Sequence, residues 1–105
     1  IVVGTDEQQM ADAVNRIVEI GGGITVMEDG AVLGEVRLDI AGIMSSGTLV
    51  SVNASLEDAK EKAFSLGVSH DIDPFMTLSF MALPVIPTLR LTTRGVFDVL
   101  QQNYV

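Results

Sequence analysis

The sequence contains no cysteine and only one histidine among its 105 residues. The lack of cysteine excludes a disulfide framework and thiolate chemistry. A zinc or binuclear metal site needs several converging imidazole, thiolate or carboxylate ligands, and hydrolytic sites usually keep more than one imidazole. We therefore expect no catalytic metal to be held by this chain, and no catalytic residue is assigned to it.

Basic residues are scarce as well, since 6 Lys and Arg stand against 14 Asp and Glu and give a formal net charge of -8. Nucleic acids and anionic membranes attract clustered basic side chains, so we expect neither as a partner. No apolar run approaches the roughly 18 residues of a membrane span, and no secretory signal is visible, which favours a cytoplasmic protein. The chain begins at Ile1 rather than at methionine, and we expect a segment of a longer protein.

Hydrophobic residues make up 48% of the chain, and its length is that of one ordinary domain. A (β/α)8 barrel of roughly 250 residues does not fit into it. In the first half, a β-branched run over residues 1–3 favours a short strand. Thr5-Asp6-Glu7-Gln8 has the spacing of a capping box and predicts a helix capped by Thr5 and ended by Gly21. Two β-rich runs, 24–27 and 31–38, flank Asp29-Gly30 and predict a hairpin.

In the second half, residues 40–47 are apolar but punctuated by glycine and are expected to form a loop. Apolar positions from Leu49 to Leu66 recur at steps of three and four, which predicts a helix from Thr48 to Gly67. Asp73-Pro74 favours a further helix through Met81, although a buried strand over 76–83 is an alternative. Residues 89–92 and 96–99 predict a second hairpin. The expected fold is α+β: one domain over residues 1–105, with a mixed β-sheet and two or three helices packed on it.

Few side chains suggest chemistry. His70 lies in Ser69-His70-Asp71-Ile72-Asp73, where an acid–base role with Asp71 or Asp73 competes with a solvated loop histidine. No serine stands in a Gly-x-Ser-x-Gly elbow. The three consecutive glycines at 21–23 follow a predicted helix and precede a strand, which is the reverse of a phosphate-binding loop, so helix termination is the better interpretation.

Apolar side chains are in surplus in two segments, the loop at 40–44 and the run 75–86. Part of this surface is expected to form the core. A domain of this size can leave the rest exposed as an interface with a neighbouring domain or subunit. For the loop both interpretations stay open, because connecting segments normally avoid contiguous apolar surface.

The same segments resemble the carboxy-terminal domain of bacterial and archaeal adenine deaminases. The resemblance is carried by DPFMTLSFMALPVIP at 73–87, LRLT at 89–92 and GVFDV at 95–99. It extends to further motifs in the first half of the chain: IVVGT at 1–5, MA at 10–11, AVNR at 13–16, EIGGG at 19–23 and AGIMS at 41–45. The stretch 53–72 is the least similar to the family.

The resemblance implies a parent enzyme of the amidohydrolase superfamily, in which a metal-bearing barrel hydrolyses adenine to hypoxanthine and ammonia in purine metabolism. Its divalent metal, manganese or iron, would be bound by barrel histidines and acids that have no counterpart in a chain whose only histidine is His70. A His-Asp-x-His-Asn signature of the family would stand upstream of Ile1. On this view the chain is an accessory domain that is inactive alone.

The resemblance also indicates which residues to examine as substrate-proximal or interface candidates: Gly42, Met44 and Ser45 in the loop, and Phe75, Thr77 and Ser79 in the apolar segment. We expect the domain to pack against the catalytic barrel of a homo-oligomeric enzyme and to support its site. Two alternatives remain. One is an autonomous oligomerisation or small-ligand-binding module without activity, and the other is a small enzyme that uses His70.

Overall fold

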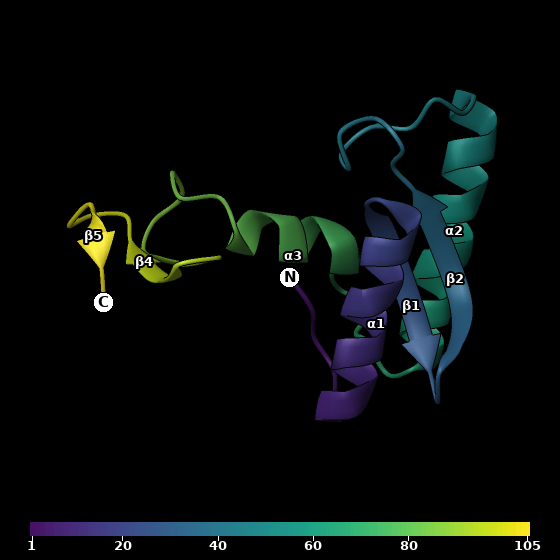
Figure 1. The fold of residues 1–105 in the computed structure, drawn as a ribbon, viewed down its shortest axis with the longest axis horizontal. Helices are drawn as coiled ribbons and strands as arrows, with labels where there is room; N and C mark the ends of the chain where they lie inside the picture. The colour runs from purple at the N-terminus through teal and green to yellow at the C-terminus, as the bar shows by residue number, and fades with distance from the viewer. The chain divides into compact units, whose positions relative to one another are not determined.

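Three α-helices and five β-strands make up the computed structural model, which describes all residues from Ile1 to Val105 (Figure 1). The chain divides into two units, Val2–Asp71 and Ile72–Val105 with Ile1. Helices and antiparallel sheets occur in both units, so the predicted α+β class is confirmed. The assignment of residues 1–105 to one domain stays a prediction. No helix has the length and apolar character needed to cross a membrane.

Helix α1 (Glu7–Ile20) begins one residue later than the capping box predicts. The N-cap is Asp6 rather than Thr5, because the Asp6 carboxylate accepts a hydrogen bond from the backbone N–H of Gln9 at 2.9 Å. The predicted end is confirmed: Gly21 adopts a left-handed conformation with φ 77°, and its N–H bonds to carbonyls of the last turn. The expected strand over residues 1–3 does not form.

Strands β1 (Gly23–Glu28) and β2 (Ala31–Arg37) form the predicted antiparallel hairpin. Asp29 and Gly30 connect them with φ values of 48° and 78°, and positive φ at both central residues is what a tight hairpin turn of this twist requires. The hairpin forms a two-stranded sheet with no further strand.

Helix α2 (Leu49–Ser65) packs against one face of this hairpin through the buried residues Ala59 and Ala63. The approach is close: a Cβ atom added to Gly34 of β2 would lie 2.8 Å from the Cα atom of Ala59. Successive residues of a strand point to opposite faces, so Glu35 lies on the other face, where Arg16 of α1 donates to it at 2.7 Å. The two helices therefore cover opposite faces of the hairpin (Figure 1).

In the second unit, helix α3 (Pro74–Met81) confirms the helical interpretation of this segment over the strand alternative. Pro74 occupies its first position, and the carboxylate of Asp73 accepts hydrogen bonds from the N–H groups of Phe75 and Met76. Strands β3 (Leu89–Thr92) and β4 (Gly95–Asp98) form the second predicted hairpin. A short strand β5 (Asn103–Tyr104), which the sequence did not predict, pairs with β4.

The prediction of one mixed sheet is wrong in two respects: the strands form two separate sheets, and both sheets are purely antiparallel. Within each sheet, consecutive strands are joined by a short turn, and a parallel pair would need a crossover of a dozen or more residues. Neither α2 nor α3 acts as such a crossover.

Very few side chains are buried. The buried apolar residues of the first unit are Val26, Val36, Ala59 and Ala63. In the second unit only Val99 and Pro74 are buried, and that segment is shorter than the roughly 40 residues below which a chain usually needs a disulfide, a metal or a partner to fold. The second unit therefore lacks a core of its own.

Candidate functional site

The loop of residues 39–46, which contains the candidates Gly42, Met44 and Ser45, is closed at its base by one carboxylate. Asp39 accepts a hydrogen bond from the backbone N–H of Ser46 at 2.8 Å and another from its hydroxyl at 2.5 Å. These two bonds from Ser46 hold the pKa of Asp39 below its ordinary value of 3.8. The ionised Asp39 carboxylate therefore stabilises the closed loop at pH values above 3.8. This stabilisation is lost as the pH falls through the lowered pKa of Asp39.

Inside this clamp, the chain reverses at Ala41 and Gly42, which have φ values of 55° and 74°. Ile40 and Met44 exchange backbone hydrogen bonds of 2.9 and 3.1 Å across the turn. Gly42 also lies against Gly22, since a Cβ atom added to Gly22 would be only 2.5 Å from the Cα atom of Gly42. The predicted loop is therefore an ordered small hairpin that rests on the α1–β1 turn.

The side chains of this loop are exposed although they are apolar. Met44 is 56% exposed and Ile43, at the far end of the turn, 73%. The first two residues of α2 add to this surface: Leu49 and Val50 are 85% and 81% exposed. Leu49 begins the apolar periodicity that predicts α2, but its side chain is not buried, because the contact with the hairpin is made further along, at Ala59 and Ala63.

Ser45 lines a shallow groove of about 300 Å³. The groove is lined by charged and hydroxyl side chains of β2 and α2 and by small residues: Glu35, Val36, Arg37, Ser45, Gly47, Ser51, Val52 and Ser55. The hydroxyl oxygen of Ser45 accepts a hydrogen bond from the N–H of Gly47 at 3.1 Å. The charged pair in the groove is itself engaged, because Glu35 accepts from Arg37 at 3.2 Å and from Arg16 at 2.7 Å. The bond from Arg16 is the main reason that the pKa of Glu35 is lowered.

The other three candidates lie together on α3, in the second unit. Phe75 is half-buried, while Thr77 and Ser79 are exposed. The Ser79 hydroxyl donates to the carbonyl oxygen of Met76 at 2.8 Å, which is a bond within the helix. The loop candidates and the helix candidates thus form two separate groups, one in each unit.

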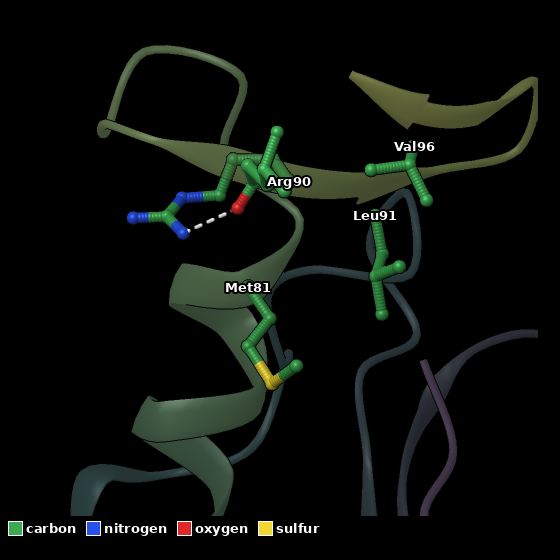
Figure 2. Close-up of a pocket in the computed structure, with 5 residues that line it drawn as sticks. Met81, Arg90, Leu91 and Val96 are labelled. Atoms are coloured by element: carbon green, nitrogen blue, oxygen red, sulfur yellow. Dashed lines mark hydrogen bonds between the residues drawn. The ribbon is translucent and has the colours of Figure 1, made fainter. Parts of the chain in front are cut away.

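A second hollow, of about 290 Å³, lies beside α3 and is lined almost wholly by apolar side chains: Met81, Leu89, Leu91 and Val96, with Arg90. Figure 2 shows Met81 approaching this pocket from the helix, and Leu91 and Val96 from the two strands. The Arg90 guanidinium donates to the carbonyl oxygens of Leu89 and Pro87, at 2.6 and 2.5 Å. Both hollows fall at or below the small end of the range of roughly 300–1,000 Å³ that ligand sites occupy.

His70 is placed for packing rather than for acid–base chemistry. Its ring stacks on that of Phe64, with centroids 4.3 Å apart, while the Asp71 carboxylate accepts a hydrogen bond from the Ser69 hydroxyl. Asp73 caps α3, as predicted for the start of that helix. No group of three or more His, Cys, Asp or Glu side chains is arranged to hold a metal ion. The residues present therefore do not fit a catalytic metal centre.

Sequence reasoning missed three features of the loop and the adjoining start of α2: the Asp39–Ser46 clamp, the contact between Gly22 and Gly42, and the exposure of Leu49 and Val50. The first two join residues 7 and 20 positions apart, and single-sequence periodicity carries no information on such pairs. A usable signal did exist for the third. No charged residue occurs between Asp39 and Glu57.

Comparisons of this chain with known proteins all point to the same family. The family model described as "Adenine deaminase C-terminal domain" matches residues 1–103. Similar curated proteins include the adenine deaminase of Bacillus subtilis strain 168, with 46% identity over 94% of this chain, and adenine deaminase 2 of Carboxydothermus hydrogenoformans, with 48% identity over 94%. The adenine deaminase of Shewanella halifaxensis is 42% identical over the full chain. No solved structure shows a significant match.

The match covers only part of each relative. This chain spans 17% of the length of the Bacillus and Carboxydothermus proteins and 18% of that of the Shewanella protein. About five-sixths of each relative therefore lies outside the region compared.

Proposed function

Because the chain belongs to the family of adenine deaminase C-terminal domains, we propose that it is the accessory part of a cytoplasmic enzyme that hydrolyses adenine to hypoxanthine and ammonia. In this role the chain packs against the catalytic part of the enzyme and supports its active site without taking part in the chemistry. The relatives carry the name adenine deaminase, and the substrate is proposed from that name.

The single observation that supports an accessory role is the exposed apolar surface of the second unit. Helix α3 is apolar around its circumference, and Met76, Phe80 and Met81 are 53%, 48% and 40% exposed. An isolated helix with apolar side chains on all faces is normally found buried. Asp73 and Asp98 are balanced by Arg90 and Arg94, so this unit also contributes nothing to the net charge of -8. Such a segment requires a covering surface, and the unmatched five-sixths of the enzyme would supply it.

A divalent metal, manganese or iron, would activate water for attack on the purine in the parent enzyme. The residues of this chain form no cluster that could bind it, so the metal would be held by the part that precedes Ile1. The contribution of the accessory domain would then be indirect: it would fix neighbouring catalytic loops and keep bulk water out of the site. The parent is expected to be a homo-oligomer.

The experiment that tests this proposal compares the full-length protein with a version that ends just before Ile1. Adenine turnover and metal content are measured together, and circular dichroism checks that both proteins are folded. We expect the shortened protein to retain its metal and to lose at least about a hundredfold in kcat/KM, because the domain that fixes the catalytic loops and keeps bulk water out is gone.

Two results would contradict the proposal. Unchanged turnover in a folded, metal-loaded shortened protein would make this chain an assembly or stability module. Absence of adenine hydrolysis by the full-length protein, with metal bound, would remove the proposed substrate.

A further inference from the structure

The 39–46 loop and the first turn of α2 form a second exposed apolar surface, within the unit Val2–Asp71. We call it the docking surface; it consists of Ile40, Ile43, Met44, Leu49 and Val50. Single exposed apolar side chains are ordinary on a protein, but five within the eleven residues from Ile40 to Val50 indicate a site of contact with another surface. None of these five side chains is among the buried residues of the unit that contains α1, β1, β2 and α2.

Charge is absent from the docking surface and abundant around it. The segment from Ile40 to Leu56 carries no Asp, Glu, Lys, Arg or His, although the unit that contains it carries the whole net charge of -8. Depletion of charged residues is the feature that distinguishes the centre of an interface from the remaining surface. The composition of this segment is therefore that of a covered surface.

The backbone beneath the docking surface is already ordered. The Asp39–Ser46 clamp closes the loop, the Ile40–Met44 pair spans the turn, and the N–H of Leu38 bonds to the carbonyl oxygen of Gly22 at 3.1 Å. Gly42 is held against Gly22 by direct backbone contact. A surface that is ordered before binding loses little conformational entropy when it docks. This is the geometry of a rigid projection and not of a mobile lid.

We propose that the docking surface inserts into an uncharged, apolar recess on the catalytic part of the same polypeptide. Two observations favour this occupant over a second copy of the chain. The relatives are about six times as long as this chain, so most of each polypeptide lies outside it and precedes the matched C-terminal domain. A second copy would bring another net charge of -8 to the contact, and like net charge opposes self-association. The inference rests on the proposed function only for the existence of that catalytic part.

The test introduces one thiol at a time into the full-length protein, since this chain has no cysteine of its own. Ile43→Cys reports on the docking surface. Val18→Cys on α1 is its matched control, because Val18 is 74% exposed and Ile43 73%, and both are β-branched. The rate of maleimide labelling at each position is measured by peptide mass spectrometry and divided by the rate in the denatured protein.

We expect the thiol at position 43 to be labelled at least tenfold more slowly than the thiol at position 18. Leu49→Cys gives a second reading of the same surface if Ile43→Cys lowers the melting temperature, and it should show the same protection. Equal normalised rates at positions 43, 49 and 18 would overturn the inference. Protection that disappears when the protein is diluted to monomers would assign the surface to a second copy and would overturn it as well.

Labelling does not depend on turnover, so the two proposals fail separately. If the full-length protein does not hydrolyse adenine but protects position 43, the proposed function is wrong and the docking surface stands. If the full-length protein hydrolyses adenine but its thiol at position 43 is labelled as fast as the thiol at position 18, the proposed function stands and the docking surface is wrong.

Discussion

Gly22→Ala is expected to destabilise the first unit by about 3 kcal/mol, since backbone strain and overpacking each cost roughly 1–3 kcal/mol. Gly22 has a φ of 119°, a conformation that residues with a Cβ atom rarely adopt. The new Cβ atom would also lie 2.5 Å from the Cα atom of Gly42, and backbone on both sides cannot move aside cheaply. The strain should be relieved by displacement of the 39–46 loop from the α1–β1 turn.

The neighbouring residue provides the control for this substitution. Gly21 also has a positive φ, 77°, but nothing lies within 4 Å of a Cβ atom added there. Gly21→Ala should therefore cost only the left-handed conformation, about 1 kcal/mol. In full-length protein, hydrogen exchange of the β1–β2 amides should be about 30-fold faster in the Gly22 variant than in the Gly21 variant, because 1.4 kcal/mol is a factor of ten. Equal exchange in the two variants would show that the loop does not rest on Gly22.

The second large effect is expected at Met76. The substitution Met76→Asp should change the stability of the protein in opposite directions depending on whether α3 is exposed to solvent or covered. Met76 is the third residue of α3. If the helix were solvent-exposed in the whole protein, Met76→Asp would be stabilising by about 0.3–1 kcal/mol, because a carboxylate near a helix N-terminus is favourable. If α3 is covered by apolar surface, as we propose, the same carboxylate is desolvated without a partner and should cost about 3 kcal/mol or more.

Melting temperature and adenine turnover of the full-length protein decide between these signs. We expect Met76→Asp to lower both, and Met76→Leu to leave turnover within about twofold, since apolar exchanges of similar volume usually cost less than 1.5 kcal/mol. A Met76→Asp variant that melts at or above the temperature of the wild type would place α3 at the surface of the enzyme. That result would remove the main support for the accessory role.

Local signals in the sequence accounted for most of the secondary structure. Asp29-Gly30 determined a hairpin, Gly21 ended α1, and Asp73-Pro74 began α3, because each depends on the conformational preferences of one or two residues. The N-cap of α1 was misplaced by one residue, since Thr5 and Asp6 can both cap and the choice depends on which side chain reaches the Gln9 N–H. The class α+β followed from these elements.

Contacts between residues far apart in the sequence could not be predicted from these local signals. The alternation of Gly34, Glu35 and Val36 does not reveal that α2 covers one face of the hairpin and α1 the other. Of the candidate site, the residues were located correctly in a loop and on a helix, but their role stays a prediction. The surplus of apolar residues in 40–44 and 75–86 was noted from the sequence, and the structure leaves much of both segments exposed.

The central claim is that the docking surface and helix α3 are both covered in the whole enzyme. Its most direct test is hydroxyl-radical footprinting of the methionines. The chain contains five. Met44, Met76 and Met81 are 40–56% exposed here, whereas Met10 and Met27 are half-buried. Oxidation of each is followed by peptide mass spectrometry in the native full-length protein and normalised to the denatured protein. We predict that Met44, Met76 and Met81 are oxidised no faster than Met10 and Met27. Faster oxidation of those three would follow their exposure in this structure and would contradict the account.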